Sequence, residues 1–151
     1  MAIRLSALAA QALVTEFGLQ SMLHGGHIRI YSGAQPASAD AAPTGQLLAV
    51  VTVGANPAPT PTDDTGGLTF VPGSRLGELR DTGDWQVRAT ASGAPGWWRA
   101  VAFDHSPDST DRSSVRMDGA VGESLDLRGL AQLESGQTYP VHAFVARMPI
   151  D

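Results

Sequence analysis

Asp104, His105 and Ser106 are the residue types of a hydrolase triad, and they stand next to one another in the sequence. A triad works when its members meet from separated elements, so that the base reaches the hydroxyl while a carboxylate orients the base. Three neighbours in one loop cannot adopt this geometry. The segment therefore predicts an Asx-type turn rather than a nucleophile.

His24 and His27 stand three residues apart, which would make only a weak zinc pair. A Gly-Gly turn separates them and no carboxylate is close in sequence, so the pattern favours turn and surface histidines. The chain also has no cysteine and no lysine, and it lacks the Gly-x-Gly-x-x-Gly pattern of dinucleotide sites. We expect no enzyme activity, no metal and no cofactor.

Two groups of carboxylates suggest calcium: Asp63 with Asp64, and Asp104 with Asp108 and Asp111. Neither has the alternate ligand positions, the central glycine and the closing glutamate of an EF-hand loop. Solvated loops are the favoured interpretation. The sequence leaves open a cation held by the second group.

Three tryptophans, Trp85, Trp97 and Trp98, stand at positions predicted to be strand. An exposed indole there would stack on a sugar ring, but tryptophans in strands more commonly anchor a core or an interface. Adjacent strand residues point to opposite faces. We therefore predict that one of Trp97 and Trp98 lies in the core and that the other covers a helix, a second sheet or a partner.

Composition fits one domain, because 151 residues with 42% apolar content suffice to bury a core. Aromatics supply only 6%, so we expect that core to be mostly Ala, Val and Leu. A net charge of -5 argues against nucleic-acid binding. The first residues are too amphipathic for a signal peptide and too short to span a bilayer, which predicts a cytoplasmic product.

One helix is predicted near the N-terminus, over residues 7–17, with Ser6 as its N-cap and Gly18 at its end. A short helix needs a surface to pack on. Its own sheet is the favoured surface, and a neighbouring subunit is the alternative. We divide the chain into an N-terminal helix or arm, residues 1–22, and a single β-sandwich domain, residues 23–151.

The rest of the chain predicts strands separated by Gly- and Pro-rich turns. The first strand alternates about Ile28 and Ile30, with His27, Arg29 and Tyr31 on the opposite side; the others are predicted at 46–54, 68–71, 85–92, 97–105, 114–121, 124–127 and 138–148. The turn at 93–96 predicts a hairpin of the strands beside it, and the last strand is long and apolar enough to be central. Residues 55–67 and 74–83 are predicted to be loops. The fold class is mainly β: an antiparallel β-sandwich or jelly-roll-like barrel with one N-terminal α-helix.

Four short segments resemble small virion proteins of tailed bacteriophages. They are Ile-Arg-Leu-Ser at 3–6, the run from Gly-His-Ile-Arg to Asp-Ala-Ala at 26–42, Gly-Gln-Leu-Leu-Ala at 45–49 and Gly-Trp-Trp-Arg at 96–99. The resemblance implies a structural component of the particle, without catalytic residues to transfer. Within that class we favour a capsid cement or decoration protein on the capsid surface, bound to the major capsid protein. A tail, neck or baseplate component and a virion carbohydrate-binding module are the alternatives.

A decoration protein on a symmetric shell should be a symmetric oligomer, so a dimer or a trimer is expected. The candidate contacts come from the predicted helix, the proline loop and the Gly-Trp-Trp-Arg segment. They are Leu5, Leu8, Leu13, Pro57, Pro59, Pro61, Trp97, Trp98 and Arg99.

Overall fold

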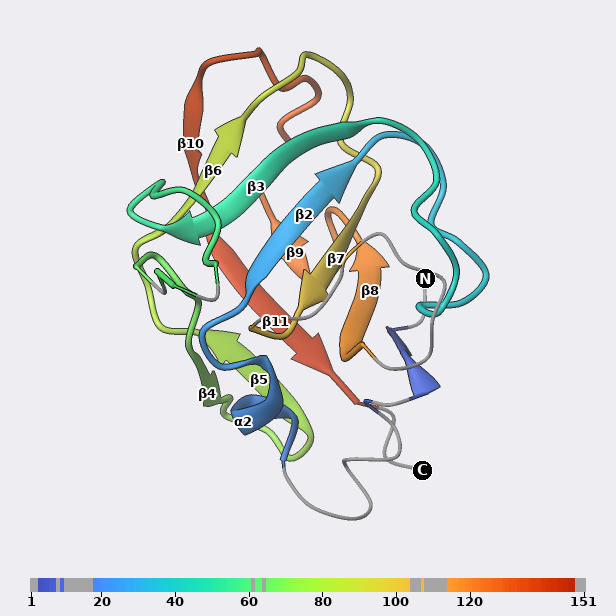
Figure 1. The fold of residues 1–151 in the computed structure, drawn as a ribbon, viewed down its shortest axis with the longest axis vertical. Helices are drawn as coiled ribbons and strands as arrows, with labels where there is room; N and C mark the ends of the chain where they lie inside the picture. Colours follow the sequence, from blue (N-terminus) through green and yellow to red (C-terminus); the bar gives the residue numbers. More distant parts are fainter. Residues whose placement is uncertain are drawn as a thin grey trace.

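The computed structural model of the chain describes residues 3–7, 9, 18–60, 62, 63, 65–103, 107 and 114–148. These residues form two antiparallel sheets and a short helix, α2 (Leu19–Leu23) (Figure 1). Ala7 and Ala9 are also helical. The large sheet has the order β1 (Arg4–Leu5), β8 (Arg116–Ala120), β7 (Trp97–Val101), β2 (His27–Tyr31), β3 (Leu47–Val53), β6 (Trp85–Ala89), β10 (Thr138–Pro140). The small sheet has the order β4 (Phe70–Pro72), β5 (Glu78–Asp81), β11 (Ala143–Arg147), β9 (Leu125–Asp126).

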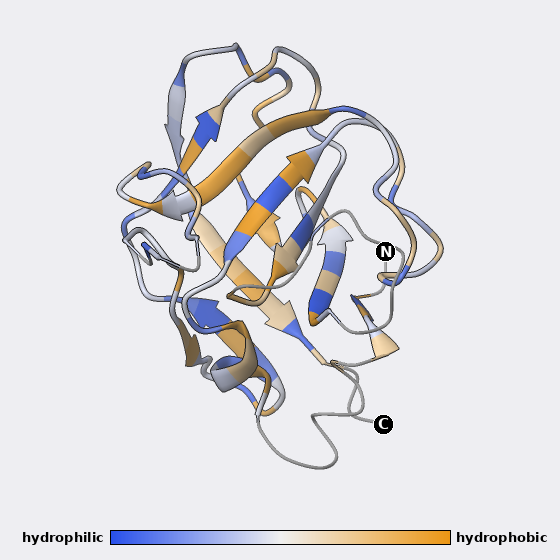
Figure 2. Ribbon diagram, in the orientation of Figure 1, coloured by the Kyte–Doolittle hydropathy of each residue, from blue (hydrophilic) through white to orange (hydrophobic). Residues whose placement is uncertain are grey.

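The core lies between the two sheets and centres on aromatic rings. Phe144 of the small sheet contacts Trp98 and Trp85 of the large sheet, with ring centroids 5.1 Å and 5.4 Å away. Phe70 of β4 closes the cluster against Trp85, at 5.1 Å. Aromatics are few, yet they hold the two sheets together. The apolar strand centres that flank them are seen in orange in Figure 2.

Buried and half-buried side chains alternate along β2 as predicted. Ile28 and Ile30 are fully buried in the core, whereas His27 and Arg29 are half-buried on the other face. β2 pairs with β3 on one side and with β7 on the other, so the strand at 27–31 is interior to the sheet. The predicted strand at 46–54 is also confirmed as the interior strand β3.

The predicted hairpin of residues 85–92 and 97–105 is wrong. β6 pairs with β3 and β10, while β7 pairs with β2 and β8, so two strands lie between them. Gly93 instead forms a β-bridge with Leu133, and the Gly96 amide donates to Tyr31 O at 2.8 Å. The turn residues at 93–96 therefore carry the chain across the ends of β2 and β3 rather than folding it back on itself.

Two other strand predictions also need correction. Residues 74–83 are not all loop, because β5 lies within them and pairs with β4 and β11. Residues 138–148 form two strands rather than one, and the chain changes sheet between them. The Val141 amide donates to Trp85 O on the large sheet, and the His142 amide donates to Asp126 O on the small one. β11 is interior as predicted, but β10 is an edge strand.

The N-terminal segment begins as a strand. Leu5, expected on the helix, is half-buried in β1, which pairs with β8. Ser6 Oγ accepts the Ala9 amide at 3.2 Å, as an N-cap does. Most of the predicted helix at 7–17 lies outside the described residues. Gly18 precedes α2 rather than following a described helix, and α2 packs on β4, where Gln20 donates to Phe70 O. No helix in the described part of the chain has the length and apolar composition needed to span a membrane.

Candidate functional site

Residues 32–45 form a long loop that runs beside β8 (Figure 1). Its carbonyl groups accept hydrogen bonds from Trp97 and Arg99 of β7, on the face turned away from the small sheet. All five residues of β7 are buried, which requires cover on both sides of the strand. Trp98 points into the core. Trp97 points outward, where its ring stacks on Tyr31 at 4.6 Å and its Nε1–H donates to Thr44 O in the loop.

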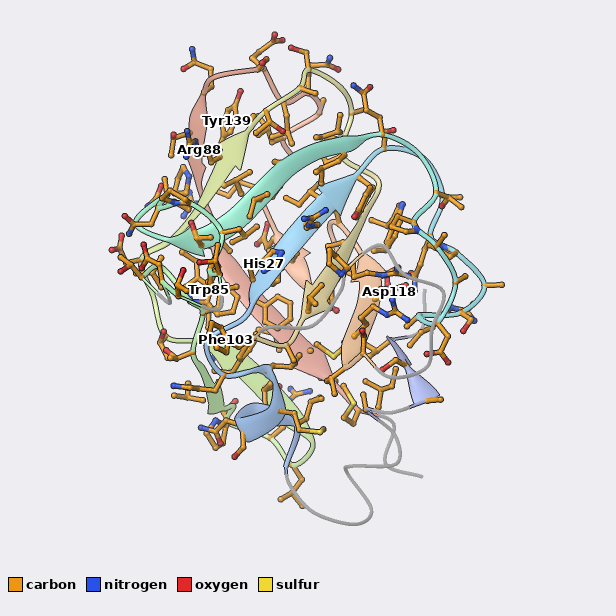
Figure 3. The ribbon with its side chains drawn as sticks, in the orientation of Figure 1. His27, Trp85, Arg88, Phe103, Asp118 and Tyr139 are labelled. Carbon is orange, nitrogen blue, oxygen red and sulfur yellow. The ribbon has the colours of Figure 1, made fainter. Side chains whose placement is uncertain are left out.

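A row of charged side chains crosses this face in register. Arg99 on β7 is paired with Asp118 on β8, and Asp118 is paired with Arg4 on β1. Figure 2 marks these strand positions as hydrophilic, and Figure 3 places Asp118 between β8 and the loop. Cross-strand neighbours lie about 5 Å apart, so strand register alone brings these charges together. We call this covered surface the capped face.

Arg99 and Asp118 form a two-pronged ion pair with both side chains fully buried. Arg99 Nε lies 2.7 Å from Asp118 Oδ1, and Nη2 lies 2.8 Å from Oδ2. Arg99 Nη1 also donates to Ala41 O at 2.8 Å and to Pro107 O at 3.1 Å. One guanidinium therefore ties β8, the 32–45 loop and a second loop to the sheet.

Asp40 fastens the same loop to the N-terminal segment. Its carboxylate accepts the Ala7 amide at 3.0 Å and lies 3.8 Å from Arg116 Nη2. Ser6 joins β8 beside it, because its amide donates to Arg116 O and its Oγ accepts the Arg116 amide. Arg4 Nη1 donates to Ala37 O at 2.6 Å. Loop, N-terminal strand and β8 are thus held as one unit.

Burial raises the pKa of the Asp118 carboxyl, while the hydrogen bond and charge of Arg99 and the charges of Arg116 and Arg4 oppose the rise. The short contacts to Arg99 are those of a carboxylate with a guanidinium. This arrangement holds a loop in place.

Of the predicted chemical groups, the structure describes His24, His27 and Asp63. Among the described residues no three His, Asp or Glu side chains are grouped to hold a metal. His27 Nε2 accepts from Arg29 Nε at 3.3 Å, and hydrogen bonds from Thr65 lower the pKa of Asp63. Asp64, Asp104, His105, Ser106, Asp108 and Asp111 lie outside the described residues.

The predicted contact residues divide into three groups, besides Leu5, which is half-buried in β1. Trp97, Trp98 and Arg99 are fully buried within the chain, so their side chains present no surface to a partner. Trp85 is also buried, which removes the exposed indole on which sugar stacking depended. Pro57 is exposed and Pro59 is half-buried in the loop predicted at 55–67. Leu8, Leu13 and Pro61 lie outside the described residues.

Sequence reasoning missed Arg116, Asp118, Asp40 and Arg4. A signal existed for two of them, because Arg116 and Asp118 stand two apart in the strand predicted at 114–121 and must share a face. Their position beside Arg99 depends on the register between β7 and β8, and a local sequence pattern does not predict that register.

The hairpin of β4 and β5 contrasts with the capped face. We call residues 71–80 the hairpin tip. Its turn is held by Glu78, whose carboxylate accepts the Ser74 amide at 3.2 Å and pairs with Arg147 Nε at 3.0 Å. Desolvation would raise the pKa of Glu78, but the Arg147 and Ser74 hydrogen bonds and the charges of Arg147 and Arg80 outweigh it, so the pKa is lowered.

Beside the hairpin tip lies a hollow of about 450 Å³ with mainly apolar walls. Leu19 of α2, Leu79 of β5 and Met148 after β11 contribute to these walls. Leu76 stands at its edge and is 87% exposed.

The four segments at 3–6, 26–42, 45–49 and 96–99 come together around the capped face. β2, the 32–45 loop, β3 and β7 are consecutive neighbours, and β1 joins them through Arg4 and Ser6. Comparison with protein-family models, curated proteins and solved structures finds no match to the chain.

Proposed function

We propose that the chain is a structural protein of a tailed-bacteriophage virion, and within that class a capsid cement or decoration protein. The observation that supports this most is that the four segments resembling phage virion proteins contact one another in the fold. Segments that are separate in sequence but in contact can form one shared surface. The two antiparallel sheets are compatible with a β-sandwich, a fold that would supply rigid surfaces. In this proposal the protein binds the major capsid protein as a dimer or trimer.

The 32–45 loop is the contact surface in this proposal. Its exposed side chains are small, with Ala34, Ala37 and Ala42 outside, while Arg4 and Arg99 hold its carbonyl groups from beneath. A surface that is already ordered loses little conformational entropy on binding. Binding only to the assembled shell would stabilise that shell by mass action.

Copy number in purified particles tests the location. A decoration protein follows the shell lattice, so we expect on the order of hundreds of copies per particle. A few copies per particle would assign the chain to the tail, neck or baseplate, and absence from the particle would refute a virion role.

Binding to tailless empty shells tests the contact surface. We expect Ala42→Glu to weaken binding, because a carboxylate is introduced on the loop, while Thr138→Glu at the exposed edge strand β10 leaves binding unchanged. Equal binding by both variants would show that the loop is not the contact.

A further inference from the structure

The large hydrophobic side chains that are exposed among the described residues lie on one hairpin. Among these residues, the large hydrophobic side chains that are exposed are Val71, at 39%, and Leu76, at 87%, and both belong to the hairpin tip. Leu76 lies at the turn, on the edge of the apolar hollow, whereas Val71 lies on β4 and lines a second hollow with Arg80. Pro72, Gly73 and Ser74 line both hollows, so the two exposed side chains form one patch. The patch is far in sequence from the 32–45 loop and shares no residue with it.

The hairpin tip is positively charged. Arg75 and Arg80 are exposed, and neither forms an ion pair with any residue that the structure describes. The neighbouring carboxylates are already engaged: Glu78 by Arg147 and the Ser74 amide, and Asp81 by the amides of Phe144 and Gly83. Since the whole chain carries -5, this cationic spot runs against the overall charge.

The hairpin tip is also held in one shape. The Gly73 amide donates to Glu78 O at 2.8 Å, and the Met148 amide donates to Gly77 O at 2.9 Å, so the turn is fixed to the end of β11. Gly77 has φ +73°, a left-handed conformation that glycine adopts without strain. A fixed apolar knob, a hollow beside it and two unpaired cations are the parts of a binding site for one kind of partner.

We propose that the hairpin tip docks an acidic protein segment that places an apolar side chain in the hollow beside Leu76 and carboxylates against Arg75 and Arg80. Charge complementarity selects this occupant over a second copy docked tip to tip, because two copies related by a twofold axis would bring their arginines together. The site is independent of the virion role and of the 32–45 loop.

The test uses the full-length protein and a pool of labelled peptides with one leucine between pairs of glutamates. Matched pools replace glutamate by glutamine or leucine by serine. We expect the acidic leucine pool to bind and both matched pools to bind more weakly. We also expect binding to decrease as salt rises, because exposed charge pairs are screened. Failure of the acidic pool to exceed the glutamine pool would overturn the proposal.

Three variants locate the binding. Leu76→Ser should weaken it roughly tenfold, the effect of losing one apolar anchor. Arg75→Glu should weaken it at low salt, and Arg88→Glu, at an exposed arginine on β6, is the matched control that should bind as the parent does. Binding that all three variants retain would place the peptide elsewhere and refute the site.

Two other occupants give distinct results. Concentration-dependent self-association in sedimentation that Leu76→Ser abolishes would assign the surface to a second copy. A parent that binds phosphatidylserine vesicles but no peptide, together with a Leu76→Ser variant that no longer binds the vesicles, would assign the surface to an anionic lipid membrane. Either outcome would overturn the proposed partner.

Discussion

The capped face and the hairpin tip reverse the usual distribution of side chains in opposite ways. Under the 32–45 loop, the charged groups of Arg99, Arg116 and Asp118 are fully buried. At the hairpin tip, the apolar side chain of Leu76 is 87% exposed. Burying charge is unfavourable unless the charge is paired, and the capped face pairs it. Exposing a leucine brings no folding stability, so the tip has no reason within the fold to carry one.

This difference indicates that the capped face contributes to the stability of the fold and that the hairpin tip is available for binding. Arg99 and Asp118 each pair with an oppositely charged side chain on another strand of the same chain, so changes at these two residues should change the stability of the fold. At the hairpin tip, Arg75 forms no ion pair with a described residue and the Leu76 side chain is exposed, so changes at these two residues should leave stability nearly unchanged.

The largest expected effect is the loss of one partner from the buried pair. Arg99→Met leaves the Asp118 carboxylate buried without its guanidinium, which should destabilise the fold by about 3 to 5 kcal/mol. Urea unfolding followed by fluorescence measures this loss. Arg88→Met, at an exposed arginine, is the control and should change stability by less than about 0.5 kcal/mol.

A double variant separates the pair from its surroundings. Combining Arg99→Met with Asp118→Leu replaces both charges and should recover part of the lost stability, because the buried carboxylate is removed while Arg116 keeps Asp40 at 3.8 Å. If Arg99→Met costs no more than Arg88→Met, the capped face does not depend on the ion pair.

The next largest effect on stability is expected where the two ends of the 32–45 loop meet. Gly45 has φ +80°, and a Cβ there would overlap the Ser32 carbonyl, so Gly45→Ala should cost about 2 to 4 kcal/mol through backbone strain and overlap. Gly33→Ala is the matched control in the same loop, since φ is +78° and no atom lies near the added methyl. Thermal unfolding of both variants isolates the overlap. Equal losses would show that strain alone matters.

Sequence patterns predicted the strands well and their partners poorly. The alternation about Ile28 and Ile30 reports which side of a strand is buried, a local property that the structure bears out. The turn at 93–96 has the residues of a hairpin, yet a turn sequence does not say which strand comes to lie beside it. β7 instead pairs with β2 and β8, because that register joins Trp97 to Tyr31 and Arg99 to Asp118.

The same limit explains the site. Trp97 and Trp98 were predicted on opposite faces, and they are, but a loop about fifty residues earlier covers the outward one. No pattern in the sequence near Trp97 predicts that a distant loop covers its side chain. Asp40 likewise gains its role from Ala7 and Arg116, which lie far from it in sequence.

A smaller effect is expected from acid at the hairpin tip. The pKa of Glu78 is lowered from its ordinary value of 4.5, so its pairing stabilises the fold above that pH and the stabilisation is lost as pH falls through the lowered pKa. Urea midpoints measured across this range should decrease less steeply for Glu78→Gln than for the parent. Parallel curves would mean that the carboxylate does not hold the turn.

The smallest effect is expected at Leu76. Leu76→Ser should change the free energy of unfolding by less than about 0.5 kcal/mol, because the side chain is already in water. Calorimetry measures this directly. A loss of more than about 1 kcal/mol would show that Leu76 packs within the fold, and the contrast between the two regions would disappear.

The pairing of β1 with β8 also sets the order in which the chain assembles. Ser6 and Arg116 are 110 residues apart, and bringing such distant residues together costs chain entropy before any contact compensates for it. During synthesis β1 has no strand to pair with until β8 has been made. The buried charges of β8 therefore become enclosed only near the end of folding, and a ribosome-bound chain that stops before residue 116 should keep its N-terminal strand open to other partners.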